Sequence, residues 1–135
     1  MPPADIKPEP GDSPGVIVIA IVEDDESFRE AVAGLIDAIG FQAAQYASAE
    51  AFLDSDGPLT SACLITDVQL PGMSGLELSR RLIELGIAIP TIVVTANPRA
   101  EIRQAAVAQG ALALFDKPID GAALSDLIHA ALRSK

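Results

Sequence analysis

The sequence has little of three things: cysteine, positive charge and long apolar runs. It contains one cysteine, Cys63, and 9 lysine and arginine residues against 19 aspartate and glutamate residues. A single cysteine excludes an intramolecular disulfide framework and is compatible with a reducing compartment. The net charge of −10 disfavours direct binding to nucleic acid or anionic membranes, because both repel an acidic surface. Such a surface suits a bound cation or a basic partner, although a merely soluble protein can share it.

No apolar run approaches the roughly 20 residues that a membrane-spanning helix needs. The amino terminus also lacks the basic and then apolar layout of a signal peptide. We therefore expect a cytoplasmic protein that does not contact a membrane. Half of the 135 residues are apolar, which is enough to build the core of one domain.

The first fifteen residues, MPPADIKPEPGDSPG, differ in composition from the rest of the chain. They hold five of the ten prolines and almost no large apolar side chains. Such a composition cannot repay the entropy of ordering, so we predict a disordered, proline-rich tail over residues 1–15. Residues 16–135 are predicted to form one folded domain without internal repeats.

Strand and helix patterns alternate through this domain. The β-branched run Val16–Val22 predicts a strand covered on both faces. Further strands are predicted from Phe41, over Ala62–Thr66, from Pro90 and over Leu112–Phe115. The predicted helices run from Phe28 to Ile39, from Ala49 to Leu53 after Ser48, from the capping box of Ser74 and Glu77 through Leu85, from Pro98 to Gly110, and after Asp120.

Five strand–helix pairs with short links predict an α/β fold. The expected architecture is a doubly wound, flavodoxin-like, five-stranded parallel sheet of order 2-1-3-4-5, with five helices in a three-layer α/β/α arrangement. In such sheets a ligand binds beyond the carboxyl ends of the strands, where the strand order reverses.

Polar side chains gather at the carboxyl ends of the predicted strands. They are Glu23, Asp24 and Asp25 after the first strand, Asp67 after the third, Thr95 at the end of the fourth and Lys117 after the fifth. Parallel strands point the same way, so these side chains are expected at one edge of the sheet. Packing alone does not explain such a group.

The chemistry open to these residues is narrow. Clustered carboxylates raise one another's pKa unless a cation joins them, and Mg²⁺ takes a couple of carboxylates while keeping several waters. A carboxylate can also accept a phosphoryl group, whose charge a metal and a lysine then neutralise. We predict Asp67 as the acceptor, Glu23 and Asp24 as metal ligands, Lys117 as the counter-ion and Thr95 as the group that senses the phosphoryl oxygens.

Four motifs carry a family resemblance: "VEDD", "LITDVQLPGMSG", "VVTA" and "FDKP". Over about Val16–Arg133 the sequence resembles the receiver domains of bacterial two-component response regulators. The segments "SAEAFL" and "GMSGLEL" are most similar to receivers of the nitrogen-fixation regulator type, which are often joined to helix-turn-helix output domains.

The resemblance implies a partner histidine kinase or phosphotransfer protein whose phosphohistidine is attacked by Asp67. It implies Mg²⁺ (or Mn²⁺) held by Glu23, Asp24, Asp67 and Gln69. It also implies a phosphoacceptor that catalyses its own phosphoryl uptake and hydrolysis rather than a turnover enzyme. Asp25 is predicted to support the start of the first helix instead of binding metal.

The resemblance further implies a conformational switch. The acyl phosphate pulls Thr95 inward and biases the surface formed by the last two helices and the fifth strand, where a downstream protein partner or a phosphorylation-dependent dimer contact binds. Receivers usually carry an aromatic residue three positions before the lysine, and this sequence has Leu114 there, with Phe115 next to it. The resemblance therefore does not extend to the aromatic part of the switch. Glu23 likewise replaces the commoner aspartate.

Two other functions stay open. Phosphatases of the haloacid dehalogenase type also use an aspartate nucleophile with Mg²⁺, a threonine and a lysine, but their D-x-D motif is absent from Asp67-Val68-Gln69. A receiver-like module that only binds partners is the third hypothesis. The sequence does not name the kinase, the signal or the oligomeric state, nor whether the chain acts alone or as the N-terminal part of a longer regulator. His129 and Cys63 are predicted to be structural.

Overall fold

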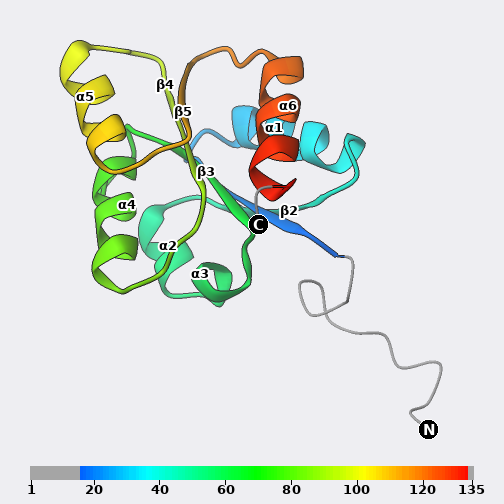
Figure 1. The fold of residues 1–135 in the computed structure, drawn as a ribbon, viewed down its shortest axis with the longest axis horizontal. Helices are drawn as coiled ribbons and strands as arrows, with labels where there is room; N and C mark the ends of the chain where they lie inside the picture. The colour runs from blue at the N-terminus through cyan, green and yellow to red at the C-terminus, as the bar shows by residue number, and fades with distance from the viewer. Residues whose placement is uncertain (1–15, 134–135) are drawn as a thin grey trace, which may run out of the picture.

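A computed structural model describes residues 16–133, so the predicted tail over residues 1–15 lies outside the described part. The described chain forms one parallel sheet in the order β2-β1-β3-β4-β5 (Figure 1), which confirms the predicted topology. The strands are β1 Val18–Val22, β2 Gln42–Tyr46, β3 Cys63–Asp67, β4 Thr91–Thr95 and β5 Ala113–Asp116.

Within residues 16–133 six helices accompany these strands, one more than predicted. They are α1 Glu26–Ala38, α2 Ala49–Leu53, α3 Gly57–Thr60, α4 Gly75–Glu84, α5 Ala100–Ala108 and α6 Gly121–Arg133. The prediction missed α3 because it is a single turn of four residues, GPLT, without a side-chain cap at its start. One turn is too short to display helical periodicity. No helix within residues 16–133 combines the length and apolar character needed to cross a bilayer.

Side-chain caps are present at the starts of α1, α2, α4 and α6, whereas α5 begins without one. The Asp25 carboxylate accepts the backbone N–H groups of the first turn of α1, as predicted for a residue that supports the helix. The Ser48 and Asp120 side chains cap α2 and α6 in the same way. Both bonds of the capping box between Ser74 and Glu77 are present at the start of α4.

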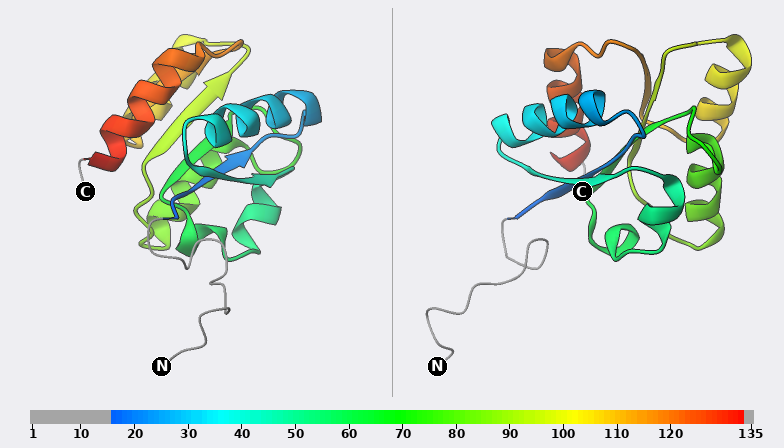
Figure 2. Two further views of the ribbon diagram at one scale, coloured as in Figure 1. Left: turned by 90° about the vertical axis from the view of Figure 1, so that its right-hand side faces the viewer. Right: turned by 180° about the vertical axis from the view of Figure 1, so that it is seen from behind.

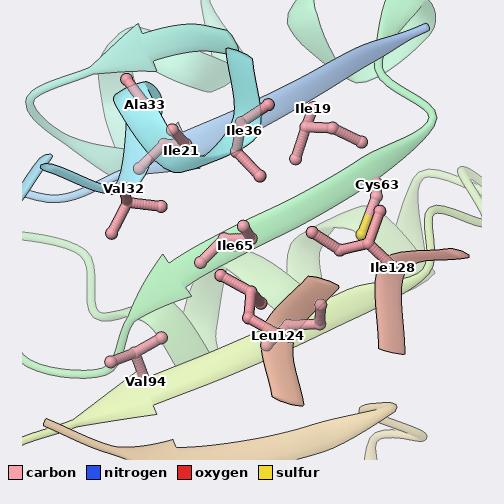
Figure 3. Packing of buried hydrophobic residues seen from close by; sticks show 11 residues of the cluster. Ile19, Ile21, Val32, Ala33, Ile36, Cys63, Ile65, Val94, Leu124 and Ile128 are labelled. Carbon is pink, nitrogen blue, oxygen red and sulfur yellow. The ribbon is translucent and has the colours of Figure 1, made fainter. Parts of the chain in front are cut away.

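The sheet is the middle of three layers (Figures 1 and 2). Helices α1 and α6 cover one face, and α2, α4 and α5 cover the other. Every residue of β1, β3 and β4 is buried, since helices cover both of their faces. Figure 3 shows the core beneath α1 and α6, where Cys63 packs among Ile19, Ile65 and Ile128. Cys63 is thus a core residue, as predicted.

Gly75 begins α4 where that helix passes the end of β3. A Cβ atom at this position would lie 2.0 Å from the carbonyl oxygen of Asp67 and 2.9 Å from its carbonyl carbon. Both are backbone atoms that cannot move without shifting β3 or α4. The absence of a side chain at Gly75 therefore lets α4 start directly against the strand that carries Asp67.

We expect Gly75→Ala to lower the free energy of unfolding by about 1–3 kcal/mol, the usual cost of forcing extra atoms into a packed site. The matched control is Gly34→Ala in the middle of α1, where no atom lies within 4 Å of the added Cβ. That change should raise stability by about 0.5–1 kcal/mol, because alanine is the better helix former. Urea unfolding of the two variants measures both effects, and equal shifts in the same direction would contradict the packing argument.

Candidate functional site

The register of the sheet aligns the predicted site residues along its carboxyl edge. Val22 pairs with Thr66, so the next residues, Glu23 and Asp67, lie at the same level on β1 and β3. On the other side, Thr95 pairs with the residue before Lys117, and the Lys117 N–H donates to the Thr95 carbonyl oxygen at 2.9 Å. Four segments far apart in sequence therefore meet at one place.

Lys117 links the two buried acids. Its Nζ donates to Glu23 Oε1 at 2.6 Å and to Asp67 Oδ2 at 2.9 Å. Glu23 is 1% exposed and Asp67 is 6% exposed, whereas the Lys117 side chain is 20% exposed at the rim. The remaining carboxylate oxygens accept backbone N–H groups, Glu23 Oε2 from Asp25 and Asp67 Oδ1 from Gln69. This is the pairing that buried charges require.

Three carboxylates are close enough to share a cation. One oxygen from each of Glu23, Asp24 and Asp67 lies within 4.8 Å of the other two. Asp24 is exposed and keeps one side of the group open to solvent. Small side-chain rotations can close this spread around an ion with bonds of about 2.1 Å and leave room for water, so the donor set fits a hard divalent cation. Asp25 caps α1 and is not part of the group.

Thr95 and Gln69 flank this group. Thr95 is fully buried at the end of β4, and its Oγ1 accepts the backbone N–H of Asn97 at 3.0 Å. Gln69 is exposed two residues after Asp67, and its backbone N–H holds the Asp67 carboxylate. The predicted roles of Thr95 as sensor and Gln69 as a further metal ligand stay predictions.

Leu114 and Phe115 lie on opposite faces of β5. Leu114 packs with Val93 and Ile102 beneath α5, on the face where the predicted switch lies. Phe115 packs into the core beneath α1 and α6. Successive strand residues point to opposite faces, so Phe115 cannot substitute for an aromatic ring at position 114.

Residues 19–129 match the family described as the response regulator receiver domain. The chain belongs to this family. The site described above lies within the matched residues, and receiver domains are the phosphorelay components of two-component response regulators. This confirms the resemblance and the signalling role that the motifs predict.

Known relatives of this receiver include transcriptional and response regulators. It is 36% identical over 119 residues to the transcriptional regulatory protein FixJ of Azorhizobium caulinodans, covering 88% of this chain and 56% of the relative. It is 40% identical over 116 residues to the response regulator protein TmoT of Ectopseudomonas mendocina, covering 86% and 53%. The receiver thus spans about half the length of these curated relatives. The crystal structure of FixJ-N is 34% identical with a TM-score of 0.77, covering 87% of this chain and 94% of that one.

Burial and neighbouring charges shift the pKa values of Glu23 and Lys117 in this site. Burial raises the pKa of Glu23, the nearby Asp67 charge adds to this, and the hydrogen bond from Lys117 offsets only part of the effect. Burial also acts to lower the pKa of Lys117, but the hydrogen bonds and charges of Glu23 and Asp67 outweigh it and raise that pKa. Lys117 therefore stays charged, while ionising Glu23 costs free energy.

This raised pKa predicts a pH dependence of stability in the absence of divalent cations. The folded receiver binds the Glu23 proton more tightly than the unfolded chain does, so the contribution is full below the ordinary pKa of 4.5 and is lost as pH rises through the raised value. We expect Glu23→Gln to lack this loss, because its side-chain amide does not ionise. Urea midpoints measured from pH 4.5 to 7.5 check it, and parallel profiles for the two proteins would contradict it.

Two contacts at the site were not predicted from the sequence. The centroid of the Phe28 ring, in the helix predicted from Phe28 to Ile39, lies 4.4 Å from Lys117 Nζ. Glu50 on α2 accepts the backbone N–H of Met73 at 2.9 Å, which lowers the pKa of Glu50 and ties α2 to the loop after Asp67. Nothing in the local sequence of either residue indicates a partner so far along the chain.

Proposed function

We propose that Asp67 accepts a phosphoryl group from the phosphohistidine of a histidine kinase or phosphotransfer protein. The observation that carries this proposal is the Lys117 ammonium, held at 2.9 Å from Asp67 and 2.6 Å from Glu23 beside a third carboxylate, Asp24. An isolated turn residue at Asp67 requires no such surroundings. An acceptor does, because its nucleophilic oxygen must stay ionised and the incoming group brings negative charge.

In the proposed step an Asp67 carboxylate oxygen forms a bond to phosphorus as the phosphorus–nitrogen bond breaks. The imidazole nitrogen keeps the electron pair of the broken bond. The Lys117 ammonium stays beside Asp67 and offsets the charge on the phosphoryl oxygens, and the Thr95 hydroxyl donates to one of them. The backbone N–H of Gln69 orients the Asp67 carboxylate for attack.

The proposed cofactor is Mg²⁺ or Mn²⁺. Glu23, Asp24 and Asp67 would hold the ion through carboxylate oxygens, with Gln69 as an additional ligand. When bound, such an ion neutralises charge on the transferring group and helps to align it with the acceptor. Glu23 in place of an aspartate is compatible with this role, since its carboxylate lies within the same group of oxygens.

The proposed output surface is formed by the elements next to Thr95 and Leu114. Phosphorylation draws Thr95 inward and biases the surface of α5, β5 and α6, with Leu114 beneath α5 as part of the switch. This surface binds a downstream protein partner or a second phosphorylated copy. The proposed receiver domain spans residues 16–135 in the cytoplasm, acts by protein contact rather than on nucleic acid, and catalyses its own phosphoryl uptake and hydrolysis without turning over other substrates.

Incubation with acetyl phosphate and Mg²⁺ tests this proposal. We expect intact mass spectrometry to detect one added phosphoryl group per chain, labile to base and hydroxylamine, and removal of Mg²⁺ with EDTA to prevent its addition. A phosphatase would instead release phosphate from p-nitrophenyl phosphate over many turnovers. No added group would favour a module that only binds partners, and sustained ester turnover would favour an enzyme; either result contradicts the proposal.

A further inference from the structure

The Lys117 ammonium has a third neighbour in addition to its two carboxylates. The centroid of the Phe28 ring lies 4.4 Å from Nζ, well inside the roughly 6 Å over which the face of an aromatic ring attracts a cation. The ring comes from the first turn of α1, and the lysine follows β5. Their contact joins the first turn of α1 to the lysine of the site.

Phe28 has supports that do not involve Lys117. Its backbone N–H is bound by the Asp25 carboxylate that caps α1, and its ring packs against the core beneath α1 and α6. Lys117 has a flexible four-carbon stem with an exposed edge. The position of the ring therefore does not depend on the lysine, and the ring can limit the movement of the lysine side chain.

The need for such a contact follows from the shared use of the two acids. In the described arrangement Lys117 is bound by both Glu23 and Asp67. Both acids also belong to the carboxylate group that fits a divalent cation, and a carboxylate that serves a cation attracts the lysine less. The Phe28 ring is the neighbour of the ammonium that a cation would not share.

We propose that Phe28 is a positioning residue for phosphoryl transfer, whose ring holds the Lys117 ammonium beside Asp67. This inference rests on the proposed function. The ring does not touch the reacting atoms. It limits the directions in which the lysine side chain can move, so that the ammonium already lies beside Asp67 before the phosphoryl group is transferred.

A series of fluorinated rings at position 28 tests the inference. Each added fluorine weakens the negative face of the ring and hardly changes its shape, so a role in packing alone predicts no trend. We expect the rate of phosphoryl uptake from acetyl phosphate at saturating Mg²⁺ to fall stepwise with one, two and three fluorines. The uptake rate of the trifluorinated variant and of Phe28→Leu should be about 2- to 5-fold lower than that of the unsubstituted protein. This is the size expected of a partly exposed cation–ring contact. Phe28→Trp should retain the unsubstituted rate.

A metal-free measurement provides a second readout. The ring current of Phe28 should move the Lys117 ε-methylene proton resonances upfield of those of exposed lysines, and Phe28→Leu should remove that displacement. Thermal unfolding confirms that each variant is folded. Equal uptake rates across the fluorinated series, or no upfield displacement, would overturn the inference while uptake by the unsubstituted protein upholds the proposed function. No uptake by the unsubstituted protein would overturn both.

Discussion

Asp67→Asn is expected to abolish phosphoryl uptake from acetyl phosphate. An amide oxygen at this position is too weak a nucleophile to form an acyl phosphate. The substitution also removes one of the three carboxylates that fit a divalent cation and one of the two that bind Lys117. The fold should survive, since the amide oxygen of the substituted side chain would still accept the Gln69 N–H, and Lys117 would keep its bond to Glu23.

Intact mass after incubation with acetyl phosphate and Mg²⁺ measures this effect as added phosphoryl groups per chain, with none expected for Asp67→Asn. Asp126→Asn on the exposed side of α6 is the matched control, because it makes the same chemical change away from the strand ends. The control should gain one group like the unsubstituted receiver. An Asp67→Asn protein that still gains one group would assign the acceptor to another residue.

Lys117→Ala is expected to slow phosphoryl uptake by about 10²–10³-fold, the usual loss when one preorganised charge-stabilising group is removed. It should also tighten Mg²⁺ binding, because the ammonium now binds Glu23 and Asp67, two of the three carboxylates that a cation would use. A slower reaction together with tighter metal binding is specific to a counter-ion role. Damage to the fold would instead lower both the uptake rate and the Mg²⁺ affinity.

Stopped reactions analysed by mass give the uptake rate, and isothermal titration calorimetry gives the Mg²⁺ affinity. Removing one partner of a buried ion pair costs about 3–5 kcal/mol, an upper bound here because the Lys117 side chain is 20% exposed. Stability is therefore measured alongside, with and without Mg²⁺. Arg103→Ala is the control, since its ion pair with Asp116 is exposed on both sides and should matter little. Uptake at the unsubstituted rate in Lys117→Ala would remove the lysine from the mechanism.

The strands and most helices could be predicted because their signals are local. Apolar β-branched runs predict buried strands, and the side chains of Ser48, Ser74 and Asp120 predict helix starts that the capping bonds confirm. The single turn α3 could not be predicted, since four residues without a cap display no period. The meeting of Glu23, Asp67 and Lys117 was predictable for a related reason: parallel strands deliver their carboxyl ends to one edge.

The order of residues along this chain thus determined the fold class, the edge at which the site forms and the acidic and basic groups within it. Only the tertiary structure decided how the atoms pair: that Lys117 bonds both acids, that Phe28 faces its ammonium and that Gly75 must leave room for the backbone of Asp67. The physical reason is the distance along the chain over which each kind of interaction acts. Hydrophobic period and capping act within a few residues, whereas these contacts join positions on different elements and exist only once the sheet register and helix packing bring them together.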